Sequence, residues 1–278
     1  MTADVGDEAR TVHAPAEARR GDASWRVVAG QETRDLWISG RGPVLLFGFS
    51  LLMSVVTYLA ASNSALNFLE QRETVNLAVQ IAVTVGVLVT LIASADAISG
   101  ERERGTLENL LLTPVSRRAI AVGKLTAALS LWFAAFLVSV PYVWVLGRGV
   151  SLVAEALLLS LLVGTLLAVG LAVLGLLVSS VSSSNKLSLS VSLFLLLALF
   201  TPTQLPALPQ GWFGTLLGRL NPVDAGMNYL DAVLVAGHGW TADLFWLVSP
   251  VVLAVVAGGV LIGAGSRMVR LFGGVRAR

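Results

Sequence analysis

The pair Gly123-Lys124 could end a phosphate-binding loop, whose glycine-rich backbone and lysine hold nucleotide phosphates. The spacing does not support that chemistry. The position five residues before Gly123 holds Arg118 instead of glycine, and Leu125 stands where a serine or threonine is required. The chain is therefore not expected to bind ATP by this motif.

Metal and hydrolytic chemistry also lack their residue patterns. The two histidines, His13 and His238, are far apart, no HExxH pair is present, and the sequence contains no cysteine. Neither a Gly-x-Ser-x-Gly elbow nor a pair of carboxylates within an apolar run is found. We therefore expect no metal site and no catalytic residues, and an enzyme that acts alone is disfavoured.

The most ordered polar pattern lies in residues 96–124, which carry charged side chains between two uncharged apolar runs. Gly105 can end the preceding helix in the left-handed conformation, and Thr106 can cap the next turn. Pro114 stops that short helix, and Ser116 offers a second N-cap. The segment therefore predicts a helix of about two turns in water, close to the membrane surface.

This short helix is predicted to be amphipathic. Leu107, Leu110 and Leu111 are spaced i, i+3 and i+4, which places them on one apolar stripe, whereas Glu108 and Asn109 point elsewhere. A solvated loop does not need a Gly-Thr break, a leucine stripe and a proline stop together.

Residues 99–108, followed by Leu111, Pro114, Arg117 and Gly123-Lys124, resemble the first cytoplasmic loop of ABC-2 type transporter permeases. In that family the loop holds a coupling helix that docks into a separate ATP-hydrolysing subunit. The resemblance implies that the chain itself has no cofactor and that ATP and Mg are bound by the partner. It assigns ATPase coupling to Glu101, Arg102, Glu103, Gly105, Thr106, Leu107, Glu108, Leu110, Leu111, Pro114 and Arg117. It also implies a second permease chain, in a homodimer or a heterodimer.

Composition places the chain in the membrane. Of its 278 residues 55% are hydrophobic and only 13% are charged, which is not the balance of a soluble protein. The formal net charge of +2 gives no reason to expect a nucleic-acid partner.

Six apolar runs predict an all-α polytopic protein with six transmembrane helices. A span of about 20 residues crosses about 30 Å of hydrocarbon. The fifth run is the shortest, and it crosses only if neighbouring serines join it. The runs are residues 42–61, 75–95, 125–146, 156–178, 187–200 and 244–265. In the fourth run, Gly164, Ala168 and Ala172 form a stripe of small residues that predicts close helix packing.

The remaining segments complete the expected organisation. Residues 1–24 are predicted to be a disordered cytoplasmic tail, residues 25–41 an interfacial elbow helix, residues 42–266 the six-span permease domain, and residues 267–278 a basic cytoplasmic tail. Residues 201–240 are broken by prolines and glycines, and by resemblance to the family they hold re-entrant outer helices near Asn221-Pro222.

Arginine placement predicts the orientation. Under this threading 16 of the 19 Lys and Arg residues lie on the side that holds both termini and residues 96–124. The positive-inside rule therefore predicts that these parts are cytoplasmic, in the inner membrane of the cell.

The substrate is not encoded in a recognisable motif. Gln80 and Thr84, one turn apart in the second run, could line a path or simply bond to neighbouring helices. The family implies export, including multidrug efflux, of drugs, antibiotics, peptides or lipid-like compounds. Two alternatives stay open: a permease that serves maturation of a copper enzyme, and a membrane anchor or sensor that transports nothing.

Overall fold

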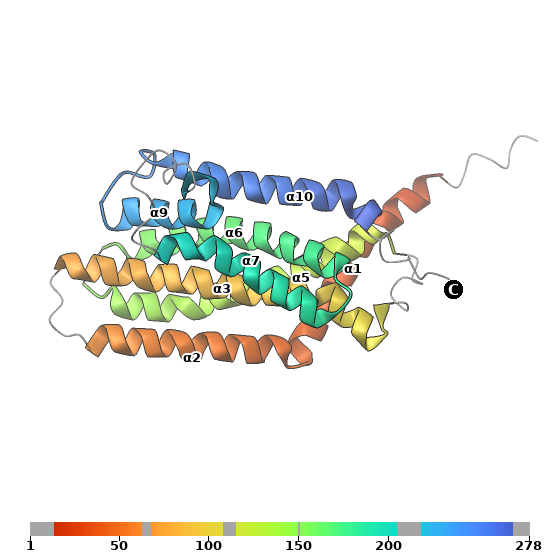
Figure 1. The fold of residues 1–278 in the computed structure, drawn as a ribbon, viewed down its shortest axis with the longest axis horizontal. Helices are drawn as coiled ribbons and strands as arrows, with labels where there is room; N and C mark the ends of the chain where they lie inside the picture. The colour runs from red at the N-terminus through yellow and green to blue at the C-terminus, as the bar shows by residue number, and fades with distance from the viewer. Residues whose placement is uncertain (1–13, 63–67, 108–114, 150, 205–217, 269–278) are drawn as a thin grey trace, which may run out of the picture.

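The computed structural model describes residues 14–62, 68–107, 115–149, 151–204 and 218–268, and in these ranges it contains helices and no strand. Five of its helices are long and apolar enough to cross a membrane. They are α2 (Arg41–Ser62), α3 (Phe68–Arg104), α5 (Arg117–Leu146), α6 (Val153–Val181) and α10 (Val248–Met268). Figure 1 shows them running along the long axis of the molecule.

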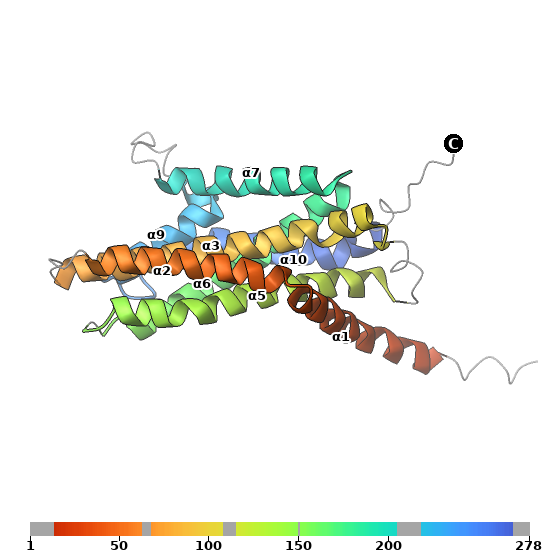
Figure 2. The same ribbon diagram turned by 90° about the horizontal axis from the view of Figure 1, so that it is seen from below.

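The predicted fifth span corresponds to α7 (Asn185–Gln204), whose apolar part is shorter than the other five. It lies beside the bundle along the same axis in both ribbon views (Figure 2). The structure therefore supports five membrane-capable helices and one shorter apolar helix, rather than six equivalent spans.

Helix α1 (Ala14–Ile38) leaves the bundle at one end, and its C-terminal half packs on α5. It contains residues 25–38 of the predicted elbow (25–41), and because it begins at Ala14 it also includes part of the segment predicted to be a disordered tail. Alanine, glutamate and arginine are strong helix formers. The tail was predicted to be disordered because it lacks an apolar run, but these residues form a helix without one. Gly40, at φ +81°, makes the turn into α2.

At the opposite end, α9 (Pro222–Leu234) contacts α7, α6, α3 and α10. Asn221 caps it by accepting bonds from the Val223 and Asp224 N–H groups, and Pro222 occupies the first turn, where its missing N–H costs nothing. The 3-10 helix η1 (Leu244–Leu247) then leads into α10. The structure does not test whether α9 belongs to a re-entrant hairpin, because residues 205–217 lie outside the described ranges.

Trp132 of α5 fills the centre of the bundle. Its ring is 1% exposed and packs against Gly86 of α3 and Gly164 of α6, while Nε1 donates to Thr165 Oγ1 at 3.0 Å. Ala168 and Ala172 are also fully buried. The small-residue stripe predicted from the sequence therefore faces the inside of the bundle, as expected.

We expect Gly164→Val to destabilise the fold, because its Cβ would overlap the indole of Trp132. Overpacking of this kind costs about 1–3 kcal/mol or more. The change should lower the thermal unfolding midpoint of the purified protein in detergent. Gly48→Val is the matched control, since a side chain at Gly48 meets open space. Equal midpoints for the two variants would contradict this packing.

Candidate functional site

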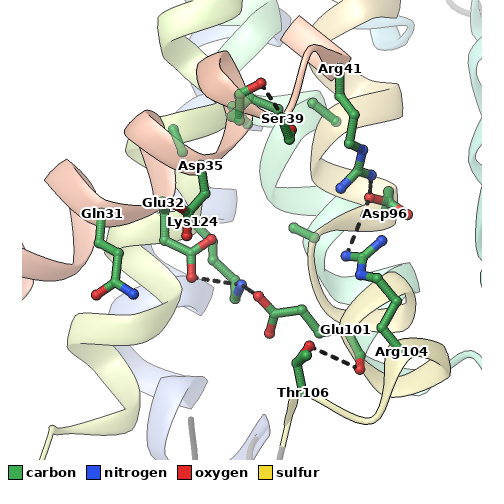
Figure 3. A pocket seen from close by; sticks show the side chains of 15 residues that line it. Gln31, Glu32, Asp35, Ser39, Arg41, Asp96, Glu101, Arg104, Thr106 and Lys124 are labelled. Carbon is green, nitrogen blue, oxygen red and sulfur yellow. Dashed lines mark hydrogen bonds and ion pairs between the residues drawn. The ribbon is translucent and has the colours of Figure 1, made fainter.

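The buried side chain of Lys124 joins three helices at one end of the bundle. It lies on α5 and is 1% exposed. Its Nζ donates to Glu32 Oε1 of α1 at 2.9 Å and to Glu101 Oε1 of α3 at 2.5 Å (Figure 3). A buried ammonium group is stable only when it is paired, so this lysine depends on carboxylates from two other helices.

Helix α1 can approach Lys124 because α5 has no side chain at Gly123, the position that faces α1. At Gly123 a Cβ would lie 2.6 Å from Val28 Cγ1, so glycine is what lets α1 come close. Further along, Trp37 Nε1 donates to Ser130 Oγ at 3.1 Å. The elbow helix is thus attached to α5 by packing, by a hydrogen bond and by the ion pair.

Burial raises the pKa of the Glu32 carboxyl, because its charged form loses hydration. The positive charge of Lys124 and its hydrogen bond act in the opposite direction. Burial of Glu32 therefore destabilises its charged form, and the ion pair with Lys124 offsets this destabilisation.

A second ion-pair cluster surrounds Asp96, whose side chain is 8% exposed. Arg41, at the start of α2, pairs with Asp96 Oδ2, and Arg104 Nη2 lies 4.0 Å from the same oxygen. Asn185 Nδ2, at the start of α7, donates to Asp96 Oδ1 at 2.7 Å. Asp96 therefore links α3 to α2 and α7.

The same end of α3 is tied to the turn between α6 and α7. Arg102 donates to the carbonyl oxygens of Ser180, at 3.0 Å, and of Ser182. Glu103 Oε1 accepts from the Asn185 N–H at 2.7 Å. The last turns of α3 consequently contact α2, α5, α6 and α7 through polar groups, and we call residues 96–104 the α3 hub.

A cavity of about 610 Å³ opens between α1, α2, α3 and α5 beside these clusters. Its lining includes charged groups that form two sets in Figure 3: Lys124 lies between Glu32 and Glu101, and Arg41 points toward Asp96. The volume lies in the range of small-molecule sites. The paired charges lining it make it a charged cleft at one end of the bundle.

The predicted end of α3 is confirmed. Gly105 has φ +68°, its N–H donates to Arg102 O at 3.2 Å, and the Thr106 N–H donates to Glu101 O at 3.1 Å. This pair of bonds is a Schellman motif. Ser116 caps α5 as predicted, with its side chain accepting from the Ala119 N–H.

The other predicted coupling residues lie in three different situations. Leu107 is buried within the chain, in a cluster with Leu176, Ala257 and Leu261. Thr106 and Arg117 are exposed. Glu108, Leu110, Leu111 and Pro114 fall outside the described residues.

The structure gives Glu101, Arg102, Glu103 and Leu107 partners within the chain, whereas the sequence analysis placed them against an ATPase. Periodicity shows which face of a helix is apolar but not what covers it. Glu32, Arg41 and Asp96 were not predicted site residues, since their partners are far away in sequence. The one available signal was Lys124, a lysine directly before the third apolar run.

Gln80 and Thr84, the two candidate path residues, are half-buried on α3. The Thr84 hydroxyl donates to the Gln80 carbonyl at 2.7 Å, so it is bonded to its own helix. Gln80 lines a separate pocket toward the other end of α3, and the two residues do not belong to the charged cleft.

Five membrane-capable helices, ended by charged clusters on one side, define a multi-pass membrane protein. The family model described as ABC-2 family transporter protein matches residues 26–261, and the chain belongs to this family. Members are transmembrane components of ABC transporters and work with ABC ATPase partners. No match was found among the curated proteins.

Proposed function

We propose that the chain is the permease subunit of an ATP-driven exporter and that a separate ATPase subunit docks on residues 105–117. The family match over residues 26–261 is the observation that carries this proposal. ATP and Mg bind to that ATPase. When the two ATPase subunits close on ATP, this chain converts their closure into movement of its helices. Drugs, antibiotics, peptides or lipid-like compounds are the proposed substrates.

The proposed assembly contains two permease chains and two ATPase subunits in the cytoplasmic membrane. Both termini and the α3 hub lie on the cytoplasmic side, since 16 of the 19 Lys and Arg residues gather there under the six-span threading. In the six-span arrangement, α7 completes the crossing between α6 and the outer segment that contains α9.

The docking contacts are proposed to come from the part of the leucine stripe that lies beyond Leu107. Leu110 and Leu111 supply apolar contact, and Glu108 and Arg117 pair with opposite charges on the ATPase. An exposed pair contributes at most about 1 kcal/mol, so apolar docking carries more of the affinity.

The α3 hub is the proposed route from the docking segment to the spans. Glu101 ties it to Lys124 of α5, Asp96 to Arg41 of α2, and Arg102 to the turn after α6. Because all these helix ends are bonded to one segment, a push at residues 105–117 is passed to them together. Packed helices move as units and do not deform continuously.

The direct test is to search the neighbouring reading frames for a soluble ATPase with a phosphate loop and to co-express it with the chain. We expect the two proteins to co-purify, and the ATPase rate to rise when the permease is present in lipid vesicles. An ATPase whose phosphate-loop lysine is changed to alanine should co-purify without hydrolysis. Failure of the intact pair to co-purify would contradict the proposal and leave the anchor or sensor interpretation.

A further inference from the structure

Helix α3 makes an unusual set of hydroxyl contacts at residues 95–99, where its apolar span ends and the α3 hub begins. In a regular α-helix the Ser99 N–H bonds to the carbonyl oxygen of Ala95, four residues earlier. Both groups of this one backbone bond also have a side-chain partner on another helix. The junction between span and hub is therefore a place where α3 can exchange a backbone bond for side-chain bonds.

The N–H side of this bond faces Ser179 of α6. The Ser179 hydroxyl oxygen accepts from the Ser99 N–H at 2.9 Å and from the Ile98 N–H at 3.1 Å. Gly175, one turn earlier on α6, keeps the two helices this close, because a Cβ there would lie 2.3 Å from Ser94 Oγ of α3. Ser179 can therefore hold both N–H donors when they leave the acceptors of their own helix.

The carbonyl side of the bond faces Ser188 of α7. Ser188 Oγ donates to the Ala95 carbonyl oxygen at 2.7 Å, and Ser99 Oγ donates to the same oxygen at 2.9 Å. A carbonyl oxygen has two lone pairs, so these two hydroxyls can fill both of them. The Ala95 carbonyl thus keeps its hydrogen bonds when the Ser99 N–H turns away.

Burial makes these replacement partners important. Ala95, Ser99, Ser179 and Ser188 are all 0% exposed, so water does not reach them. An opened backbone bond in such a place would normally leave a donor and an acceptor unpaired, which is strongly unfavourable. Sharp helix bends occur where a side chain inserts into the series of backbone bonds, and serine hydroxyls re-satisfy freed backbone groups in membrane helices. The hydroxyls therefore make bending at this point of α3 far less unfavourable.

We propose that α3 contains a hinge at residues 95–99, about which the α3 hub swings between a straight and a bent arrangement. In the straight arrangement the Ser99 N–H bonds to the Ala95 carbonyl; in the bent one Ser179 holds the N–H, and the hydroxyls of Ser188 and Ser99 hold the carbonyl. A bend of about 20° moves the end of the hub by about 3–5 Å. The use of this swing by a docked ATPase rests on the proposed function, whereas the hinge itself does not.

The experiment exploits the absence of cysteine from the sequence, because pairs of introduced cysteines can then carry spin labels. Double electron–electron resonance is measured on the purified permease in lipid nanodiscs, without ATPase. One sample joins Glu103→Cys on the hub to Ile262→Cys on α10, and a second joins it to Phe133→Cys on α5; all three positions are exposed. A swing that leaves one of these distances constant changes the other. Leu77→Cys, an exposed position near the other end of α3, replaces the hub label as the control.

We expect two hub distances that differ by about 3–5 Å in at least one sample, and a single distance for the Leu77→Cys label. Ser179→Ala removes the acceptor used in the bent arrangement and should lower the population of that arrangement at least about tenfold. Ser188→Ala should act in the same direction from the carbonyl side. Ser180→Ala is the matched control and should leave both distances unchanged, since this buried hydroxyl donates to the Leu177 carbonyl of its own helix.

Three results would overturn the hinge: a single hub distance in both samples, two distances that persist in both serine variants, or a Leu77→Cys label that moves with the hub, as a rigid tilt of α3 requires. Unfolding midpoints distinguish a lost arrangement from a lost fold, and Ser188→Ala still tests the hinge if Ser179→Ala does not fold. Because no ATPase is present, each of these results leaves the permease function standing. Failure of ATPase co-purification with two hub distances would instead remove the proposed function and retain the hinge.

Discussion

Lys124→Met is expected to abolish ATP-driven transport and to destabilise the protein, because it leaves Glu32 and Glu101 facing each other without a counter-charge. Removing one partner from a buried ion pair costs about 3–5 kcal/mol. The loss should appear as a strongly lowered unfolding midpoint in detergent. Inside-out vesicles that contain the Lys124→Met variant should also lose ATP-dependent uptake of the transported compound.

The chain provides its own control, since Lys186 is the only other lysine and is exposed on α7. Lys186→Met should leave both measurements close to wild type. Combining Lys124→Met with Glu32→Gln and Glu101→Gln removes the uncompensated charge and should restore the midpoint. If transport also returns in the triple variant, Lys124 holds the fold without transmitting movement, and the proposed route through the hub is wrong.

Leu110→Asp is expected to eliminate co-purification of the ATPase while membrane insertion and the unfolding midpoint stay unchanged. Leu110 belongs to the predicted leucine stripe that contacts the ATPase. Its replacement by aspartate would bury an unpaired carboxylate in the interface, which is strongly unfavourable. The measurement is the amount of ATPase retained by the affinity-tagged permease in detergent.

Asn109→Asp adds the same charge one position away, off the predicted stripe, and should retain the ATPase. Leu107→Asp provides a contrasting variant. Leu107 is buried against α6 and α10, so this change should lower the unfolding midpoint as well. Full retention of the ATPase by Leu110→Asp would place the docking surface elsewhere.

The spans were the most predictable part of the fold. Apolar length in a membrane leaves the backbone few options besides a helix, so the predicted runs and the observed helices agree closely. The exception is α7, where a 14-residue apolar run was already too short to be a clear span. The break at Gly105 and the cap at Ser116 were also predictable, since each depends on local backbone chemistry.

The contacts of the charged residues were less accessible from sequence. Glu101 lies 23 positions from Lys124, and Glu32 lies 92 positions away on a helix that no periodic pattern places on α5. Asn76 donates to Asp231, from which it is separated by 155 positions. The packing of the helices decides which charged residues pair with each other. The spacing of residues along one helix carries no information about these pairs.

The pairing of Lys124 also has a consequence for how the chain is made. Glu32 and Glu101 both precede Lys124, so a ribosome synthesises the two acids before the base. Because α1 is synthesised before α5, the Glu32 carboxylate already exists when Lys124 is added to the chain. A truncated gene product that starts after α1 would insert α5 without Glu32, and Glu101 would then be the only one of these two carboxylates left to pair with its Lys124.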